Sequence, residues 1–152
     1  QKSSQATILI LNDNSEIIQN MLQYFSFDLR HKEKLSILYL YASSIVSLDD
    51  EAGSVFLPYF VDIGISKSIF SELVDSIVST QCQKMILDII KCIVRLLVFS
   101  SNARVNENLS MMNTISKLIT PEQIYEIAEF SKDHKNWSFK LIEMIEKHQE
   151  NQ

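Results

Sequence analysis

Cysteine and histidine are two of the residue types in this 152-residue chain that can act as nucleophiles or bind a metal. Cys82 and Cys92 lie ten residues apart on one expected helix, which separates them by roughly 15 Å, too far for a disulfide within that helix. Apolar residues surround both, so we expect two core-filling thiols of a reducing compartment. His31, His134 and His148 stand far apart without a second ligand at metal spacing, and we expect them at the surface.

No pattern in the chain indicates catalysis or a bound cofactor. Gly53 and Gly64 are the only glycines, which excludes a glycine-rich phosphate loop and leaves no setting for a nucleophile elbow. Asp62 and Asp88 could be imagined as an acid and a base, but both fit ordinary solvated positions on helices. The sequence therefore predicts a protein that is not an enzyme and that needs no metal or other cofactor.

Four residues are candidates for binding a partner. Lys84, Lys91 and Arg95 are spaced by seven and four residues, so they can share one side of a long helix. This side is either solvated surface or a concave surface that binds an acidic or phosphorylated protein segment through charge-assisted hydrogen bonds. Trp137, the only tryptophan, is expected either to pack inside or to belong to an apolar end face that meets another repeat or subunit.

Charge and hydropathy narrow the class of partner. The net charge is −5 and the basic residues are scattered, so we expect no nucleic-acid binding. The apolar stretch 86–99 is interrupted by Asp88, Lys91 and Arg95, and no run reaches the roughly 20 apolar residues of a membrane span. Without a secretory signal, we expect an intracellular protein, cytoplasmic or nuclear. The polar opening 1–5 without a methionine suggests a domain from a longer chain.

Scarce glycine and proline beside 46% apolar residues favour an all-helical chain over a sandwich or barrel. Apolar residues recur at helical spacing in most of the segments between polar clusters. After an apolar segment over residues 6–11, we expect helices at about 17–25, 28–48, 55–61, 66–78, 80–99, 105–109 (at most a short one), 111–119, 121–131 and 137–148.

Polar, glycine and proline residues set the expected boundaries between these helices. We expect an acidic turn at residues 49–53, a proline in the first turn of the next helix, and a helix end at Gly64. Thr80 is the expected cap of the long helix, and residues 100–102 are expected to break the chain after it. Thr120 begins the clearest start signal, a capping box followed directly by proline.

The helices recur as a unit. A shift of 49 residues places six apolar residues of segment 37–48 over six of segment 86–97. The order of long, short, medium and long helices resembles the armadillo repeat. Residues 60–74 resemble the link between the first two helices of that family, and residues 79–102 resemble its long third helix. Two degenerate units cover roughly residues 26–119, with partial units on either side.

The resemblance implies a single domain over residues 1–152 that is a right-handed α-solenoid of about three armadillo-like repeats; a compact helical bundle is the alternative. It also implies a non-catalytic scaffold that binds a partner peptide or helix in its concave groove. The alternative function is a structural bundle that docks into a multi-protein assembly through an apolar face. Lys91 and Arg95 occupy the positions of the Trp–Asn ladder in importin-like members, so binding of nuclear-localisation peptides is not expected.

Overall fold

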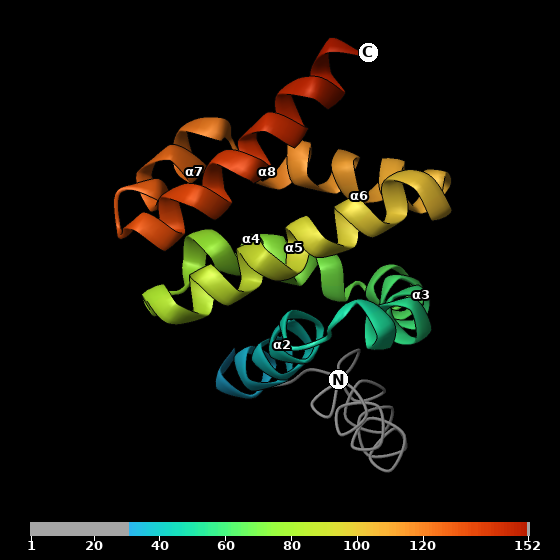
Figure 1. Cartoon of the computed structure of the whole chain (residues 1–152). Coiled ribbons are helices and arrows are strands. Elements are labelled where there is room, and N and C mark those ends of the chain that lie inside the picture. Colours follow the sequence, from blue (N-terminus) through green and yellow to red (C-terminus); the bar gives the residue numbers. More distant parts are fainter. Residues whose placement is uncertain (1–30, 152) are drawn as a thin grey trace.

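The computed structural model describes residues 31–151, and every regular element within them is an α-helix (Figure 1). The prediction of an all-α fold is therefore confirmed for this part of the chain. The apolar segment 6–11 and the helix expected at 17–25 lie outside the described residues. The helices are α2 (His31–Val46), α3 (Asp50–Ser66), α4 (Ile69–Ser79), α5 (Gln83–Ala103), α6 (Val105–Leu118), α7 (Pro121–Ala128) and α8 (Lys132–Glu150).

Helix α5 is the centre of the arrangement. It packs against α2 on one side and against α8 on the other, so that these three helices follow one another through the molecule (Figure 1). Helices α3 and α4 connect α2 to α5, and helices α6 and α7 connect α5 to α8. Helix α4 contacts α6, and α7 packs along α8. Long helices from separate parts of the sequence thus become neighbours.

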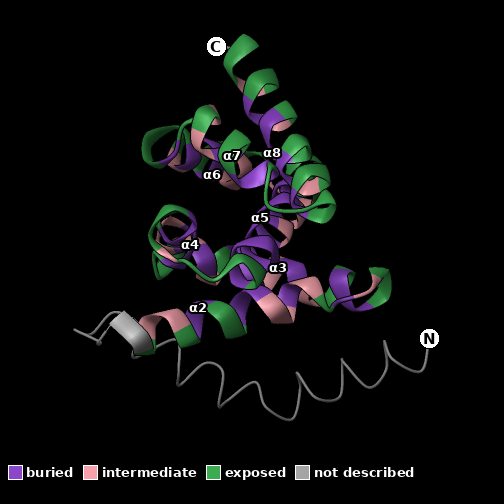
Figure 2. Cartoon of the chain, turned by 90° about the vertical axis from the view of Figure 1, so that its left-hand side faces the viewer, coloured by how far each residue is buried: buried purple, intermediate pink, exposed green. Residues whose placement is uncertain are grey.

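One continuous apolar core runs between the helices (Figure 2). Helix α5 provides its largest share, because it is buried around most of its circumference by α2, α4, α6 and α8. Although α5 is largely apolar, neither it nor any other helix within residues 31–151 has the length and hydropathy of a membrane span. The fully buried aliphatic residues of α5 are Ile89, Ile90, Ile93, Leu96 and Leu97.

Helix α3 is longer than predicted at both ends. The expected acidic turn is its beginning, where the carboxylate of Asp49 caps the helix by accepting a hydrogen bond from the Ala52 N–H at 2.9 Å. Gly64 does not end the helix but lies inside it, at a close approach to α2: a Cβ there would lie 2.6 Å from the Tyr41 hydroxyl. Pro58 stands in the middle of α3 and not in its first turn, where it removes one backbone hydrogen bond without ending the helix.

Of two breaks predicted in the second half of the chain, one lies later than expected, at Arg104 between α5 and α6, and the other is absent. Ser100 and Ser101 lie within α5, and their hydroxyls donate to the carbonyls of Leu97 and Val98, three residues earlier, at 3.2 and 2.8 Å. Helix α6 is likewise continuous where a break was expected. Its Asn108 side chain donates to the Leu97 carbonyl and to the Ser100 hydroxyl, both at 3.0 Å, and so ties α6 to α5.

Helix starts differ in how well the sequence predicted them. The capping box of α7 is present: the Gln123 N–H donates to the Thr120 hydroxyl at 3.3 Å, and the Gln123 side chain accepts from the Thr120 N–H at 2.9 Å. Thr80 is not the cap of α5; the N-cap is Cys82, whose N–H donates to the Thr80 hydroxyl in the link between α4 and α5. Helix α8 begins earlier than expected, after its capping residue Ser131.

Candidate partner-binding groove

A groove opens where the middle of α5 faces the end of α2 and the second and third turns of α8. It has a volume of about 710 Å³, and we call it the basic groove. Its charged lining residues are Lys91, Arg95, Lys140 and Asp50, and Trp137 forms part of its wall. Three of the four candidates from the sequence, Lys91, Arg95 and Trp137, are thus brought together. The aliphatic residues of its wall are Val46, Leu48, Val94 and Val98.

Trp137 contacts the apolar core and also lines the groove. One part of the side chain packs against the core, and the residue as a whole is half-buried. The ammonium of Lys140 lies 4.2 Å from a ring centroid of Trp137, and that of Lys91 lies 5.9 Å away. Both distances allow attraction between a cation and an aromatic ring. Two lysines from different helices therefore meet at one aromatic side chain.

Arg95 holds the fold together in addition to lining the groove. Its guanidinium donates to the backbone carbonyls of Ile45 at 2.9 Å, of Leu48, and of Asp49 at 3.1 Å. These carbonyls belong to the end of α2 and the link to α3, where a cation also interacts favourably with the helix dipole. Gly53, expected in a turn, lies inside α3 and leaves room for the guanidinium, since a Cβ would lie 3.1 Å from its nitrogen.

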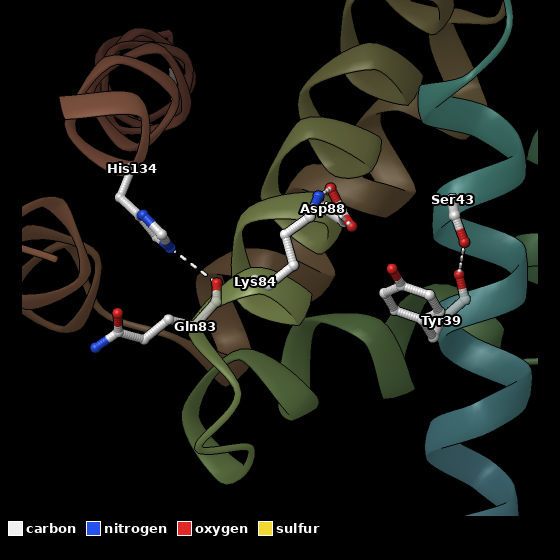
Figure 3. Close-up of polar contacts among 6 residues, drawn as sticks. All are labelled: Tyr39, Ser43, Gln83, Lys84, Asp88 and His134. Atoms are coloured by element: carbon white, nitrogen blue, oxygen red, sulfur yellow. Dashed lines mark hydrogen bonds and ion pairs between the residues drawn. The ribbon is translucent and has the colours of Figure 1, made fainter. Parts of the chain in front are cut away.

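Lys84 lies outside the basic groove. Its ammonium pairs with the carboxylate of Asp88 one turn further along α5, at 2.9 and 3.0 Å (Figure 3). This hydrogen bond raises the pKa of Lys84, and the carboxylate balances its charge. The three cations predicted on one side of the helix therefore do not form one binding surface, and only Lys91 and Arg95 line the groove.

The two carboxylates considered as an acid and a base have separate ion pairs. Asp88 is only 4% exposed, so the expectation of a solvated position is wrong for it; burial of its charge requires the counter-charge that Lys84 supplies. Asp62 on α3 is exposed, as expected, and pairs with Arg104 at 2.9 Å. Arg104 also lies 3.6 Å from a carboxylate oxygen of Glu107.

His134 is buried, which corrects the expectation of a surface residue. Its Nε2 lies 2.8 Å from the Gln83 carbonyl oxygen (Figure 3), and its Nδ1 lies 2.7 Å from the Ser131 hydroxyl. A carbonyl oxygen only accepts, so Nε2 is assigned the proton, and the ring joins the start of α8 to the start of α5. His148 is half-buried, and the side chain of His31 lies outside the described residues. Within those residues, no three His, Cys, Asp or Glu side chains are grouped to hold a metal ion.

The two cysteines are free thiols with opposite exposure. Cys92 is buried in α5, as expected, and burial raises the pKa of its thiol, which keeps it neutral. Cys82 is exposed, so the expectation of a core residue is wrong for it. Tyr41 is buried nearby; burial and the neighbouring Cys92 raise its pKa, and its hydroxyl donates to the Phe60 carbonyl at 2.5 Å.

Besides the aliphatic wall, two charged groove residues were not predicted from the sequence. Lys140 follows Trp137 by three residues, a spacing that places both side chains on the same side of a helix, so a signal was available. Asp50 was assigned to an acidic turn, and it reaches the groove because α3 begins there. No local signal connects Asp50 with residues of α8.

The basic groove combines an aromatic ring, aliphatic walls and three cations. Such a surface can hold an anionic group and an apolar side chain side by side. Comparisons with protein-family models, with curated proteins and with solved structures found no match to this chain.

Proposed function

We propose that this protein is a non-catalytic interaction scaffold whose basic groove binds a negatively charged peptide segment or helix of a partner protein. The observation that carries the proposal is the segregation of charge. In a chain with a net charge of −5, the groove collects Lys91, Arg95 and Lys140 against a single carboxylate, Asp50. A local positive surface on an acidic protein attracts an anionic partner and repels a basic one.

The size and apolar content of the groove support a peptide over a small free anion. Its volume of about 710 Å³ lies within the range of pockets that enclose organic ligands. Trp137 and the aliphatic walls can bury an apolar side chain, and tryptophan is among the residues that most often dominate binding energy at interfaces. Lys91 and Lys140 would then meet carboxylates that flank this apolar anchor.

The proposal includes an armadillo-like arrangement in which α2, α5 and α8 are equivalent helices that line the groove. Helix α8 begins 49 residues after α5, the offset that also aligns the apolar residues of α2 and α5. At this offset, five buried positions of α5 correspond to five buried positions of α8. Stacked units of this kind create an elongated surface for a partner. The positions are Met85, Ile89, Cys92, Ile93 and Leu96 on α5, and His134, Ser138, Leu141, Ile142 and Ile145 on α8.

Trp137 provides a direct test, because it is the only tryptophan in the chain and lines the groove. A random peptide display library would be selected against the wild-type protein, and enriched peptides would be titrated while the emission of Trp137 is recorded. We expect enriched peptides to be rich in Asp and Glu and to change this emission. We expect the variant Lys91→Glu/Lys140→Glu to weaken their binding by at least about tenfold.

A matched control separates the groove from the overall charge. The variant Lys117→Glu/Lys132→Glu changes the net charge equally at two exposed lysines outside the groove, and it should bind as the wild type does. Thermal melting followed by circular dichroism checks the fold of both variants, and Arg95 stays intact because of its backbone contacts. Enriched peptides that bind both variants as tightly as the wild type would contradict the proposal.

A further inference from the structure

The basic groove adjoins a second groove near the C-terminal ends of α5 and α8. This second groove has a volume of about 360 Å³ and shares Val98 with the basic groove as a common wall. Met112 and Met144 supply apolar surface, and Lys147 and His148 extend into its lining from α8. None of the described residues that line it carries a carboxylate. Lys147 therefore places a further cation on α8 beyond the basic groove, with the exposed Glu143 between it and Lys140 along the helix.

Two lysines of α8, one in each groove, lie on the same side of the helix. Lys140 and Lys147 are seven residues apart, which places them on the same side of the helix, two turns or about 10 Å from each other. None of the ion pairs found among residues 31–151 includes Lys91, Lys140 or Lys147. Val98, which is 56% exposed, offers an apolar contact where the two grooves meet.

We infer that the partner segment is acidic and lies along α8 across both grooves, with an apolar side chain against Trp137, one carboxylate at Lys140 and a second at Lys147. This inference rests on the proposed function. It adds the length of the bound segment and the spacing between its two carboxylates. An extended chain covers about 3.3 Å per residue, so its second carboxylate follows the first by about three residues. In a helical segment, which rises 1.5 Å per residue, it follows by about seven.

The pattern of contacts favours an acidic peptide over a nucleic acid. A nucleic-acid backbone carries a phosphate at every nucleotide and is repelled by a protein of negative net charge. Along α8, by contrast, two lysines stand two turns apart, and the apolar side chains of Trp137, Val98 and Met144 line the same two grooves. A peptide in which carboxylates alternate with apolar side chains matches this arrangement.

Fluorescein-labelled synthetic peptides test the register. A short probe contains one leucine flanked by glutamates, and a long probe adds a second pair of glutamates either three or seven residues further on. A third probe replaces the added glutamates of the tighter long form with glutamines. Fluorescence anisotropy gives the Kd of each probe for the wild type, for Lys140→Glu, for Lys147→Glu and for the exposed control Lys117→Glu.

We expect the wild type to bind the better long probe about three- to fivefold more tightly than the short and the glutamine probes. Lys147→Glu should remove this gain and leave the short probe unaffected, whereas Lys140→Glu should weaken both. Because Lys147 is exposed, the melting temperature should not change; if it falls, Lys147→Gln repeats the comparison with a smaller change of charge.

Two outcomes would overturn the inference, and they differ in what they imply for the proposed function. If the short probe binds and Lys140→Glu weakens it, but the long probe gains nothing or Lys147→Glu leaves the gain intact, the second groove is not used and the proposed function stands. If no probe binds the wild type, the proposed function fails together with the inference.

Discussion

The two sides of α5 are built differently. At the first junction, where α2, α3 and α5 meet, polar side chains reach backbone partners: Tyr41 donates to the Phe60 carbonyl, and Arg95 donates to three carbonyls. At the second junction, between α5 and α8, the buried hydroxyl of Ser138 has no hydrogen-bond partner among the described residues. Trp137 is there only half-buried, beside two lysines. The second junction has one such contact, from His134 to the Gln83 carbonyl at the starts of α8 and α5. Further along these helices Ser138 is unpartnered and Trp137 lines the basic groove, whose opposite wall is the end of α2.

Glycine reveals how tightly the first junction is packed. Both glycines of the chain lie in α3, one facing the Tyr41 hydroxyl and the other facing the Arg95 guanidinium. A polar group buried between helices must keep its hydrogen bonds, and here it does so where the opposing helix carries no side chain. Polar contacts opposite the two glycines thus fix the distances between α2, α3 and α5, whereas the middle of the α5–α8 junction leaves Trp137 half-buried in the basic groove.

The largest expected effect comes from removing Arg95. We expect Arg95→Met to lower the free energy of unfolding by about 3 kcal/mol, because a charged donor to three carbonyls is lost and those carbonyls remain partly buried. Lys91→Met, one turn earlier on the same helix, should change it by less than about 0.5 kcal/mol. Urea denaturation measures the free energy of unfolding of both variants. Equal losses in Arg95→Met and Lys91→Met would show that the contacts of Arg95 do not stabilise the first junction.

The second-largest expected effect is a loss of stability at alkaline pH, caused by Cys92 and Tyr41 near the first junction. Burial raises the pKa of Cys92, so above about pH 8.5 the unfolded chain releases a proton that the folded chain keeps, and stability falls as the pH rises. We expect a loss of about 2 kcal/mol at pH 10, and Tyr41, whose pKa is also raised, adds to it at higher pH.

Urea denaturation at several pH values measures this loss, with two variants as controls. Cys92→Ala should remove most of the pH dependence below pH 10, whereas Cys82→Ser, at the exposed cysteine, should retain it. A flat stability profile between pH 8 and pH 10 in the wild type would show that Cys92 is not buried as described.

Adding a Cβ at Gly64 should lower the free energy of unfolding by somewhat less than the change to pH 10. We expect Gly64→Ala to lower the free energy of unfolding by about 1 to 2 kcal/mol, since the contact with the Tyr41 hydroxyl outweighs the gain in helix propensity. In the double variant Gly64→Ala/Tyr41→Phe, the nearest remaining ring atom lies at an ordinary contact distance of 3.6 Å. The combined loss should therefore be smaller than the sum of the two single losses, and strict additivity would speak against the close approach.

The smallest expected effect, with the opposite sign, lies at the second junction. We expect Ser138→Ala to raise the free energy of unfolding by about 0.5 to 1 kcal/mol, because an unpartnered buried hydroxyl is removed and alanine favours the helix. Ser100 is the matched control: it is equally buried, but its hydroxyl bonds to Leu97 and Asn108. Ser100→Ala should therefore lower stability, and a loss in both variants would mean that Ser138 has a partner.

Prediction from the sequence succeeded where the signal is local. The apolar spacing identified the helical segments within the described part of the chain, and Thr120 marked the start of α7 because both partners of its capping box lie within three residues. Prediction failed where glycine, serine or asparagine was taken as a helix end. Gly64 and Ser100 lie inside helices and face other helices: Gly64 lies against Tyr41 of α2, and the Ser100 hydroxyl accepts from Asn108 of α6, so tertiary packing outweighs weak helix propensity.

The sequence by itself determined that the chain is helical, which faces are apolar, and that three cations share one side of α5. The pairing of Lys84 with Asp88 is also local, because the two residues are four apart on one helix. Only the tertiary structure decided the roles of the other two cations: Arg95 binds backbone carbonyls, and Lys91 meets Trp137 in an open groove. The reason is that a charge acts on groups within a few ångströms, and the groups nearest Arg95 and Lys91 belong to α2, α3 and α8, whose distance from α5 no spacing along the chain reports.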